Sequence, residues 1–397
     1  MSGPTPRRLR RFAEQVLGLK RYLRHPGDGR PRPQIAARHL VWAQLMGVIL
    51  RHGAFHAVEF LVRSRARGAL GVGRSFGDDA LAYFTERLDV SCARRALTGM
   101  LRRAKRNKAF ENSRFIGLAL DGTGAGRSRK PGCAWCCPQI QAGQGVVGHL
   151  HKMSALSVVG HSLVLPVDVE PYGPGDSELA ASRRLIERAV PHLGTRFADY
   201  LVADGLYAAA PFLNRVSELG LRAVVRLKAN VPELLRAVEA RYAGRAPDQV
   251  FEHAGDRVEV WDAADFDPWE GLEWTTVRVI RYRQHRPDGT ICAADWLTNY
   301  PTTQVGSRSL YVVAKSRWQI ENGVFNDGKN RYGLEHIHHH QQTSLLVTWL
   351  LICLALAVER LYRLRFLHRG AQPPRSAIDM VRVLWLTLGA PRPADSG

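Results

Sequence analysis

Cysteine is scarce in this chain, with 6 residues among 397. Small secreted proteins that rely on disulfide bonds are much richer in cysteine, so a disulfide-stabilised scaffold is excluded. The opening segment, MSGPTPRRLRRF, also lacks the apolar core of a signal peptide. We therefore expect a protein of the reducing cytoplasm.

A hydrophobic run long enough to cross a bilayer is lacking as well. The longest apolar stretch covers residues 344–358, SLLVTWLLICLALAV, and Glu359 and Arg360 follow it directly. A membrane-spanning helix needs about 20 apolar residues. The run is shorter than that, so it predicts a buried helix in a protein without membrane contact.

Acidic side chains are few in residues 1–110, which contain 7 Asp and Glu and 23 Lys and Arg. The rest of the chain contains 29 Asp and Glu and 33 Lys and Arg. A bias toward arginine codons would replace Lys by Arg but would not remove acids. The concentrated positive charge therefore indicates a module that binds a polyanion such as nucleic acid. Leu and Phe recur at helical intervals in residues 8–24, and residues 35–66 and 79–110 also read as helices. We predict a basic, all-helical DNA-binding domain at residues 1–110.

The pattern changes beyond residue 110. Short apolar runs predict three strands, then a helix, a strand, a helix and a strand, ending near Lys228. This order is that of ribonuclease-H-like nucleases, so the predicted fold class is α/β with a mixed sheet. Alternating apolar and polar residues predict a β insertion at residues 245–300. We assign residues 111–371 to this catalytic domain and residues 372–397, rich in Pro and small residues, to a peripheral C-terminal tail.

Three acids stand out by their position. Asp121 in LALDGT and Asp204 in LVADGLY each end an apolar strand, and Glu321 lies in a predicted helix, in RWQIEN. The Gly after each Asp leaves the backbone room to approach a ligand. Carboxylates that converge at one sheet edge repel one another unless cations neutralise them, and oxygen ligands suit Mg²⁺ or Mn²⁺. The acids therefore predict a divalent metal site able to support phosphodiester chemistry.

Four motifs in this order resemble those of bacterial insertion-sequence DDE transposases that carry a β insertion between the second Asp and the Glu. They are LALDGTG, DSELAA at 176–181, ADGLYAAAPF at 203–212 and RWQIENGVFNDGKNRYGLEH at 317–336. The resemblance implies a DNA transposase in which Asp121, Asp204 and Glu321 bind the metal and are catalytic. It implies cleavage at the ends of a mobile element and strand transfer into target DNA. The implied partners are the terminal inverted repeats, the target DNA and a second subunit on the paired ends.

Three basic residues are candidate DNA contacts. Arg317 precedes Glu321 by four residues and shares its helix face, so it would hold a phosphate or act as a charge partner of Glu321. The resemblance also implies a lysine further along this helix. Lys329 stands one residue later than the usual place, and Ala314 occupies the position where the family often has Tyr. Lys228, at the end of the predicted fifth strand, is the third candidate.

A second metal site is suggested by Cys133 and Cys136, with His149 and His151 downstream. Two Cys and one or two His suit structural Zn²⁺, and the alternative is a pair of free surface thiols. His336, His338, His339 and His340 form a tract that we interpret as a polar surface or a DNA contact rather than as ligands.

Two other functions are compatible with these motifs. One is a ribonuclease-H-like nuclease or resolvase that cleaves DNA without joining strands. The other is a non-catalytic DNA-binding protein derived from a transposase, which is expected to lack at least one of the three carboxylates. All three are present in this chain.

Overall fold

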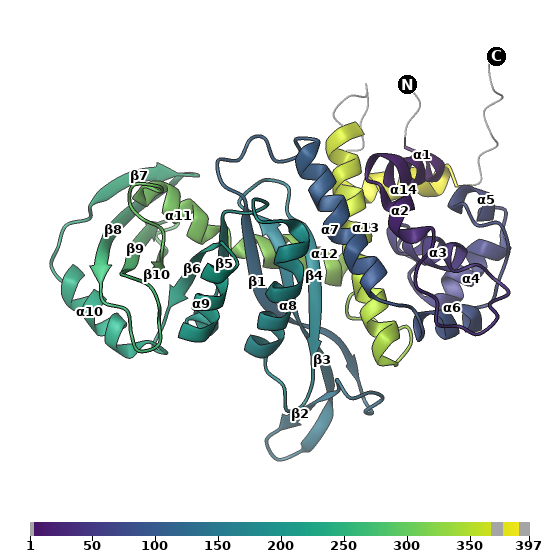
Figure 1. The fold of residues 1–397 in the computed structure, drawn as a ribbon, viewed down its shortest axis with the longest axis horizontal. Coiled ribbons are helices and arrows are strands. Elements are labelled where there is room, and N and C mark those ends of the chain that lie inside the picture. The colour runs from purple at the N-terminus through teal and green to yellow at the C-terminus, as the bar shows by residue number, and fades with distance from the viewer. Residues whose placement is uncertain (1–3, 367–375, 389–397) are drawn as a thin grey trace.

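The computed structural model describes residues 4–366 and 376–388. Helices gather at one end of the molecule, and a twisted sheet runs from its middle to the other end (Figure 1). The N-terminal helices are α1 (Pro6–Arg11), η1 (Phe12–Val16), α2 (Leu19–Leu23), α3 (Ala37–Ile49), α4 (Phe55–Arg63), α5 (Arg67–Leu70), α6 (Asp78–Thr85) and α7 (Ser91–Arg106).

Among the described residues, one mixed sheet contains ten strands, in the order β2-β3-β1-β5-β6-β10-β9-β8-β7, with β4 also paired to β3. β1 and β5 are parallel, as are β5 and β6, whereas β3 is antiparallel to β1 and to β4. The strands are β1 (Gly117–Ser128), β2 (Cys137–Gln141), β3 (Gly145–Val159), β4 (Leu165–Tyr172), β5 (Tyr200–Ala203), β6 (Arg222–Leu227), β7 (Gln249–His253), β8 (Asp256–Phe266), β9 (Val277–His285) and β10 (Ile291–Thr298).

The predicted β insertion extends this same sheet. β10 pairs antiparallel with β6, and β9, β8 and β7 follow outward in turn. The remaining helices cover the sheet or connect its strands: α8 (Glu178–Leu193), η2 (Gly205–Tyr207), α9 (Ala210–Glu218), α10 (Pro232–Tyr242), α11 (Ser307–Lys315), η3 (Ile320–Phe325), α12 (Asn326–Tyr332), α13 (Gln342–Phe366) and α14 (Ala377–Leu386).

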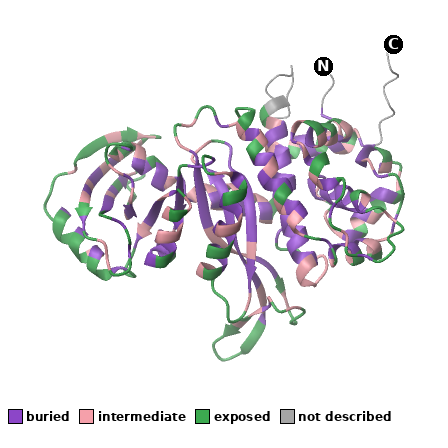
Figure 2. Cartoon of the chain, viewed as in Figure 1, coloured by how far each residue is buried: buried purple, intermediate pink, exposed green. Residues whose placement is uncertain are grey.

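The apolar run near the C-terminus forms α13, a core helix that packs against β4, α3 and α7. Its stretch Gln342–Leu364 is long and apolar enough to cross a membrane by length and composition alone, but 94% of its most apolar window is buried inside the protein. Figure 2 shows the buried colour running along α13 and the central strands, with exposed residues at the far end of the β2–β3 hairpin. The helix thus joins the sheet to the N-terminal helices in one hydrophobic core.

The expectation of a peripheral tail is wrong for residues 376–388. Ser376 caps α14 by accepting a hydrogen bond from the backbone N–H of Asp379, and Met380 and Leu384 are buried. Trp385 donates its indole N–H to the carbonyl of Leu50, at 3.0 Å. Helix α14 therefore packs against the N-terminal helices, because apolar residues within the Pro-rich segment find a non-local partner there. Residues 372–375 and 389–397 of the predicted tail lie outside the described residues.

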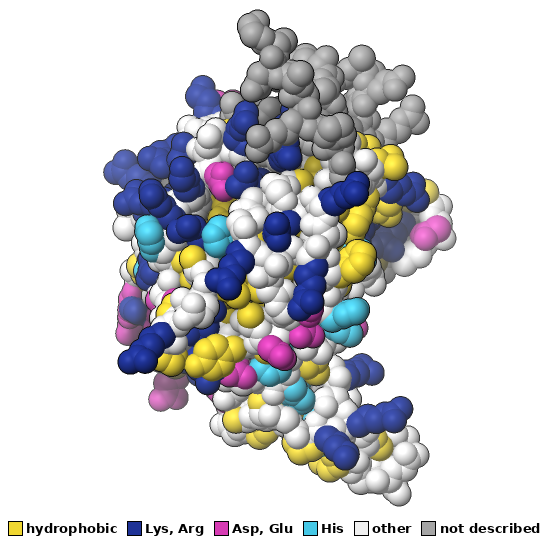
Figure 3. Space-filling view, turned by 90° about the vertical axis from the view of Figure 1, so that its right-hand side faces the viewer, with side chains coloured by type: hydrophobic (Ala, Val, Ile, Leu, Met, Phe, Trp, Pro, Cys, Tyr) yellow, Lys and Arg dark blue, Asp and Glu magenta, His cyan; other side chains and the backbone are white. Residues whose placement is uncertain are grey.

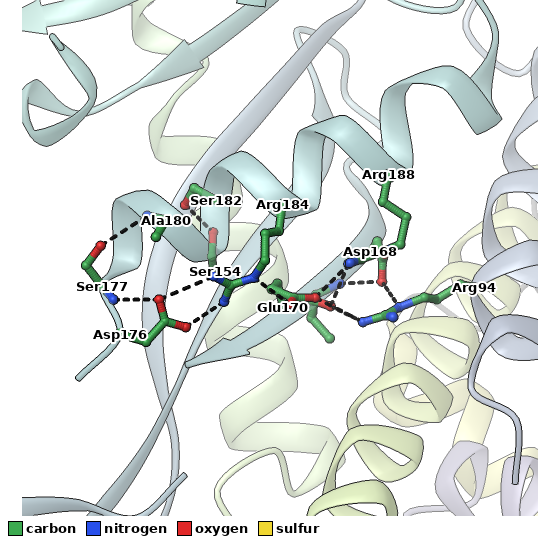
Figure 4. Close-up of polar contacts among 11 residues, drawn as sticks. Arg94, Ser154, Asp168, Glu170, Asp176, Ser177, Ala180, Ser182, Arg184 and Arg188 are labelled. Carbon is green, nitrogen blue, oxygen red and sulfur yellow. Dashed lines mark hydrogen bonds and ion pairs between the residues drawn. The ribbon is translucent and has the colours of Figure 1, made fainter. Parts of the chain in front are cut away.

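A polar network joins α7, β4 and α8 (Figure 4). Asp168 of β4, which is 2% exposed, accepts hydrogen bonds from Nε of Arg94 at 3.1 Å and Nε of Arg188 at 2.9 Å. Glu170, two residues on, pairs with the same two arginines and with Arg184. A buried carboxylate needs such partners to offset its lost hydration. The network therefore fixes the N-terminal helices against the sheet.

Candidate active site

Asp121 and Asp204 lie at the same level of the sheet. β1 and β5 are neighbouring parallel strands in which Leu120 pairs with Ala203, and each Asp is the next residue. Neighbouring strands lie about 4.8 Å apart, so the register places the two residues side by side where β5 ends. Asp204 follows the last residue of β5 as expected, but the expectation that Asp121 ends its strand is wrong, because β1 continues to Ser128 in its pairing with β3.

Glu321 reaches the same point from η3. The guanidinium nitrogen Nη1 of Arg317 lies 3.1 Å from Oδ2 of Asp121 and 2.7 Å from Oε1 of Glu321. One nitrogen thus bridges the strand acid and the helix acid. The Arg317 side chain is 8% exposed and that of Glu321 is 42% exposed, so the arginine lies inside and the glutamate faces solvent. The sequence left two roles open for Arg317, a phosphate contact or a charge partner of Glu321. In this structure it is a charge partner.

Asp204 has its own cation. Nζ of Lys228 lies 2.7 Å from Oδ2 of Asp204. Gly205 makes this approach feasible, because a Cβ atom at Gly205 would come within 2.7 Å of the Lys228 side chain. The glycine after the second acid therefore leaves room for a lysine rather than directly for a ligand.

The glycine after the first acid has a parallel role. A Cβ atom at Gly122 would come within 2.0 Å of Oε2 of Glu178, so this carboxylate packs directly over the backbone beside Asp121. The hydroxyl of Tyr172 donates to Oε2 of Glu178 at 3.1 Å, and that of Tyr207 donates to Oε1 at 2.9 Å. Glu178 is thus a fourth acid at the site.

The sequence alone favours a solvated helix face for Glu178, with a part in the metal site as the alternative. The first is wrong, because the side chain packs over Gly122 and accepts from two tyrosines. Ser177 caps α8 by accepting from the backbone N–H of Ala180, and this fixes Glu178 in the first turn with its side chain toward the sheet. The sequence feature that could have indicated this position of Glu178 is the preceding Ser177, a favourable N-cap residue, in the DSELAA motif. The two tyrosines that hold it come from β4 and η2, and no local pattern reveals them.

The electrostatics of the acids differ from one another. Burial raises the pKa of Asp121 to about 7; Arg317 opposes this rise, and the nearby Glu321 and Glu178 add to it. Burial also acts to raise the pKa of Asp204, but the Lys228 ammonium outweighs it and the pKa falls below the ordinary value. The site thus gathers more negative charge than its two cations neutralise.

Lys329 lies beyond a π-helical turn that follows Glu321. The backbone N–H of Asn326 donates to the carbonyl of Glu321, five residues earlier, whereas an α-helix would join residues four apart. The turn contains one extra residue, so Lys329 takes the rotational position that the preceding residue would have in a regular helix. Nζ of Lys329 pairs with Oε1 of Glu335 at 3.3 Å, and Ala314 is fully buried.

The oxygen-only set of Asp121, Asp204, Glu321 and Glu178 fits a hard divalent cation better than zinc. The main evidence for this fit is the pKa of Asp121, which burial, with Glu321 and Glu178 adding to it, raises to about 7, so the buried carboxylate lacks compensating positive charge. The geometry therefore links Asp121 and Glu321 through Arg317, places Asp204 at the same level of the sheet, and adds Glu178 beside Asp121.

The predicted zinc ligands come together with one exchange. Cys133, Cys136, His151 and His340 place one ligand atom each within 4.8 Å of one another. His149 is not in this group, because it lies two residues back along β3, about 7 Å away, and His340 fills the fourth place. The interpretation of the histidine tract as surface is thus wrong for His340.

Comparisons with known proteins were made for sequence and for structure. A family profile described as "Transposase DDE domain" matches residues 113–358, which is more than half of the chain. Curated protein sequences gave no match. The structure titled "Cryo-EM structure of piggyBac transposase synaptic complex with hairpin DNA" is similar, with 10% identity, 97% of this chain and 80% of that chain covered, and a TM-score of 0.46.

Proposed function

Because the chain belongs to the transposase DDE domain family, we propose that it cleaves phosphodiester bonds at the ends of a mobile element and transfers the freed strands into target DNA. The observation that carries this proposal is the convergence of Asp121, Asp204 and Glu321, from two strands and a late helix, around Arg317 and Lys228. A non-catalytic derivative would have no reason to keep three mutually repelling carboxylates at one point.

Asp121, Asp204 and Glu321 would hold the divalent cation, Mg²⁺ or Mn²⁺, with Glu178 beside them. When bound, the cation activates an attacking water or 3′-hydroxyl and stabilises the leaving oxygen. Tyr172 and Tyr207 hold the Glu178 carboxylate by their hydroxyl groups and thereby fix its distance from Asp121. Glu178 is therefore proposed as a positioning residue for the first acid.

The cations already at the site are suited to hold DNA. Arg317 and Lys228 each donate to a catalytic carboxylate, and both would turn to phosphate oxygens once other positive charge neutralises the acids. Lys329, half-buried beyond the π-helical turn, is a third phosphate contact in this proposal. Lys228 has the greatest freedom, since its side chain is 46% exposed.

The basic N-terminal helices are proposed to bind the element ends. Figure 3 looks onto this part of the molecule and shows Lys and Arg side chains crowded at its upper left. Six exposed basic side chains of α1, of α2 with its C-cap residue and of α7 form no ion pair within residues 4–366 and 376–388: Arg11, Lys20, Arg21, Arg24, Arg102 and Arg106. Unpaired cations on adjoining helices are available for phosphates, so affinity should fall steeply with salt.

The strand order supports a ribonuclease-H-like catalytic domain. Antiparallel β4, β3 and β1 followed by parallel β5 and β6, with α8 and α9 as connections, is the arrangement that we predicted for residues 111–371. Three further parts of this proposal follow from the sequence analysis. Residues 1–110 form a DNA-binding domain, the protein acts as a homodimer on paired ends, and it acts in the cytoplasm.

The test is a cleavage and joining assay in Mg²⁺ with DNA that carries the element's own ends. Wild type is compared with Asp204→Asn and with Glu252→Gln, a matched control in which an exposed acid of the outermost strand β7 loses its charge. We expect cleavage and joining by wild type and the control, and a loss of at least about 100-fold in Asp204→Asn. Cleavage without joining would indicate a nuclease, and salt-sensitive binding without cleavage would indicate a DNA-binding protein.

A further inference from the structure

The cluster of Cys133, Cys136, His151 and His340 lies apart from the catalytic acids. Cys133 and Cys136 belong to the loop between β1 and β2, His151 is in β3, and His340 precedes α13. His151 is four residues along β3 from Ala155, the partner of Asp121 in β1. At about 3.4 Å per residue this is roughly 14 Å, too far for the cluster to act on the same phosphate as the acids.

Five of the six distances within the cluster are close to the edges of a tetrahedron, and all six are within 4.8 Å. Sγ of Cys133 and Sγ of Cys136 are 3.9 Å apart, and Nε2 of His151 and Nε2 of His340 are 3.2 Å apart. The sulfur-to-nitrogen distances are 3.3 Å for Cys133–His151, 3.5 Å for Cys136–His151 and 3.2 Å for Cys136–His340. Zinc bonds of about 2.3 Å to sulfur and about 2.0 Å to nitrogen would give tetrahedral edges of about 3.8 Å between the sulfurs, about 3.3 Å between the nitrogens and about 3.5 Å between sulfur and nitrogen.

Hydrogen bonding alone does not explain this arrangement. Nε2 of His151 faces three polar atoms, the two sulfurs and Nε2 of His340, all within 3.5 Å. A ring nitrogen has one proton or one lone pair, so it satisfies one such neighbour. His151 is fully buried and Cys136 is 6% exposed, so water does not satisfy the others. Four ligand atoms that face one point are instead what a bound ion requires.

The surroundings are shaped for His340. A Cβ atom at Gly132 would lie 2.4 Å from Nδ1 of His340, so only glycine lets the ring pack at this place. Trp135, between the two cysteines, stacks on Trp349 of α13 with ring centroids 6.2 Å apart. The cluster is therefore enclosed by an apolar wall, as structural metal sites are.

We propose that these four residues form a closed structural zinc site that ties the β1–β2 loop and β3 to the chain between α12 and α13. Two thiolates and two imidazoles suit Zn²⁺, and a full set of four protein ligands leaves no open position for catalysis. The site would fix the strand that pairs with Asp121 relative to the segment that follows Glu321. It is a different metal site from the carboxylate centre and does not depend on the proposed reaction.

The test is the zinc content of the full-length protein, expressed with zinc and purified without chelator, measured by mass spectrometry of the elements. We expect one zinc per chain in wild type, and loss of at least about 80% in Cys136→Ser and His340→Ala. The matched controls are Cys137→Ser and His149→Ala, neighbouring residues of the same types outside the cluster, which should keep the zinc. Zinc retained in His340→Ala but lost in His149→Ala would overturn the ligand set.

A second measurement covers variants that fail to fold. Wild-type protein prepared with Co²⁺ in place of Zn²⁺ should show the intense visible absorption of tetrahedral cobalt and a sulfur-to-cobalt charge-transfer band. Wild type without zinc, or cobalt with only weak octahedral absorption, would overturn the proposal. Since neither readout uses DNA, a failure here is distinct from a failure of the transposase proposal.

Discussion

Replacing Asp168 by Ala tests the physical reasoning about the network between α7, β4 and α8. The carboxylate is 2% exposed and joins Arg94 and Arg188. Removing one partner of a buried ion pair costs about 3–5 kcal/mol, because the remaining charge stays buried without compensation. Both arginines keep Glu170 as a partner, at 3.2 Å and 2.8 Å, so we expect the low end, about 3 kcal/mol of unfolding free energy.

The assay is equilibrium unfolding in urea, followed by circular dichroism and by tryptophan fluorescence. Arg184→Ala is the matched control within the same network, since the Arg184 side chain is 44% exposed and its ion pairs should contribute no more than about 1 kcal/mol. If Asp168→Ala costs no more than Arg184→Ala, the claim that burial makes this network strong is refuted.

Three further predictions concern the acidic site. Glu178→Gln should lower Mg²⁺-dependent cleavage by about tenfold or more in a single-turnover assay, because it alters the group that packs beside Asp121; unchanged cleavage would remove Glu178 from the site. Gly122→Ala should lower the thermal midpoint and cleavage together, since its Cβ would lie 2.0 Å from Glu178, and a fully active variant would contradict the packing. Asp121→Asn should change the pH dependence of stability: the folded-state pKa of about 7 lies above the ordinary value of 3.8, so wild type loses stability as pH rises from about 4 to about 7, and the Asn variant does not. Thermal melts at pH 5 and pH 8 without added divalent metal measure the thermal midpoint of the variant minus that of wild type. This difference should increase from pH 5 to pH 8, and an unchanged difference would contradict the raised pKa.

The strand order and the positions of the three candidate acids could be anticipated where the signal is local. Apolar runs that end in Asp-Gly identify the strands of Asp121 and Asp204, and the order of strands and helices follows from periodicity. The apolar run near the C-terminus correctly predicted a buried helix, although α13 extends beyond it at both ends. These features depend on neighbouring residues, which a sequence displays directly.

The remaining features depend on residues far apart in the chain. Glu178 is held at the site by the hydroxyl of Tyr207, which lies on a different element. His340 contacts Cys136 although the two residues are 204 positions apart. Trp385 finds its acceptor at Leu50 in the same way. Single residues of common types give no local sign of such partners. The exchange of His149 for His340 shows the limit most clearly, since His149 is near the cysteines in sequence and His340 is near them in space.

The most direct test of the central claim is anomalous X-ray scattering from crystals of the protein grown with Mn²⁺, recorded at the manganese edge. We predict an anomalous peak in contact with the carboxylates of Asp121 and Asp204 and close to Glu321, absent in crystals of Asp204→Asn. A well-ordered map at saturating Mn²⁺ with no peak at these carboxylates would contradict the claim that they form one metal-dependent catalytic site.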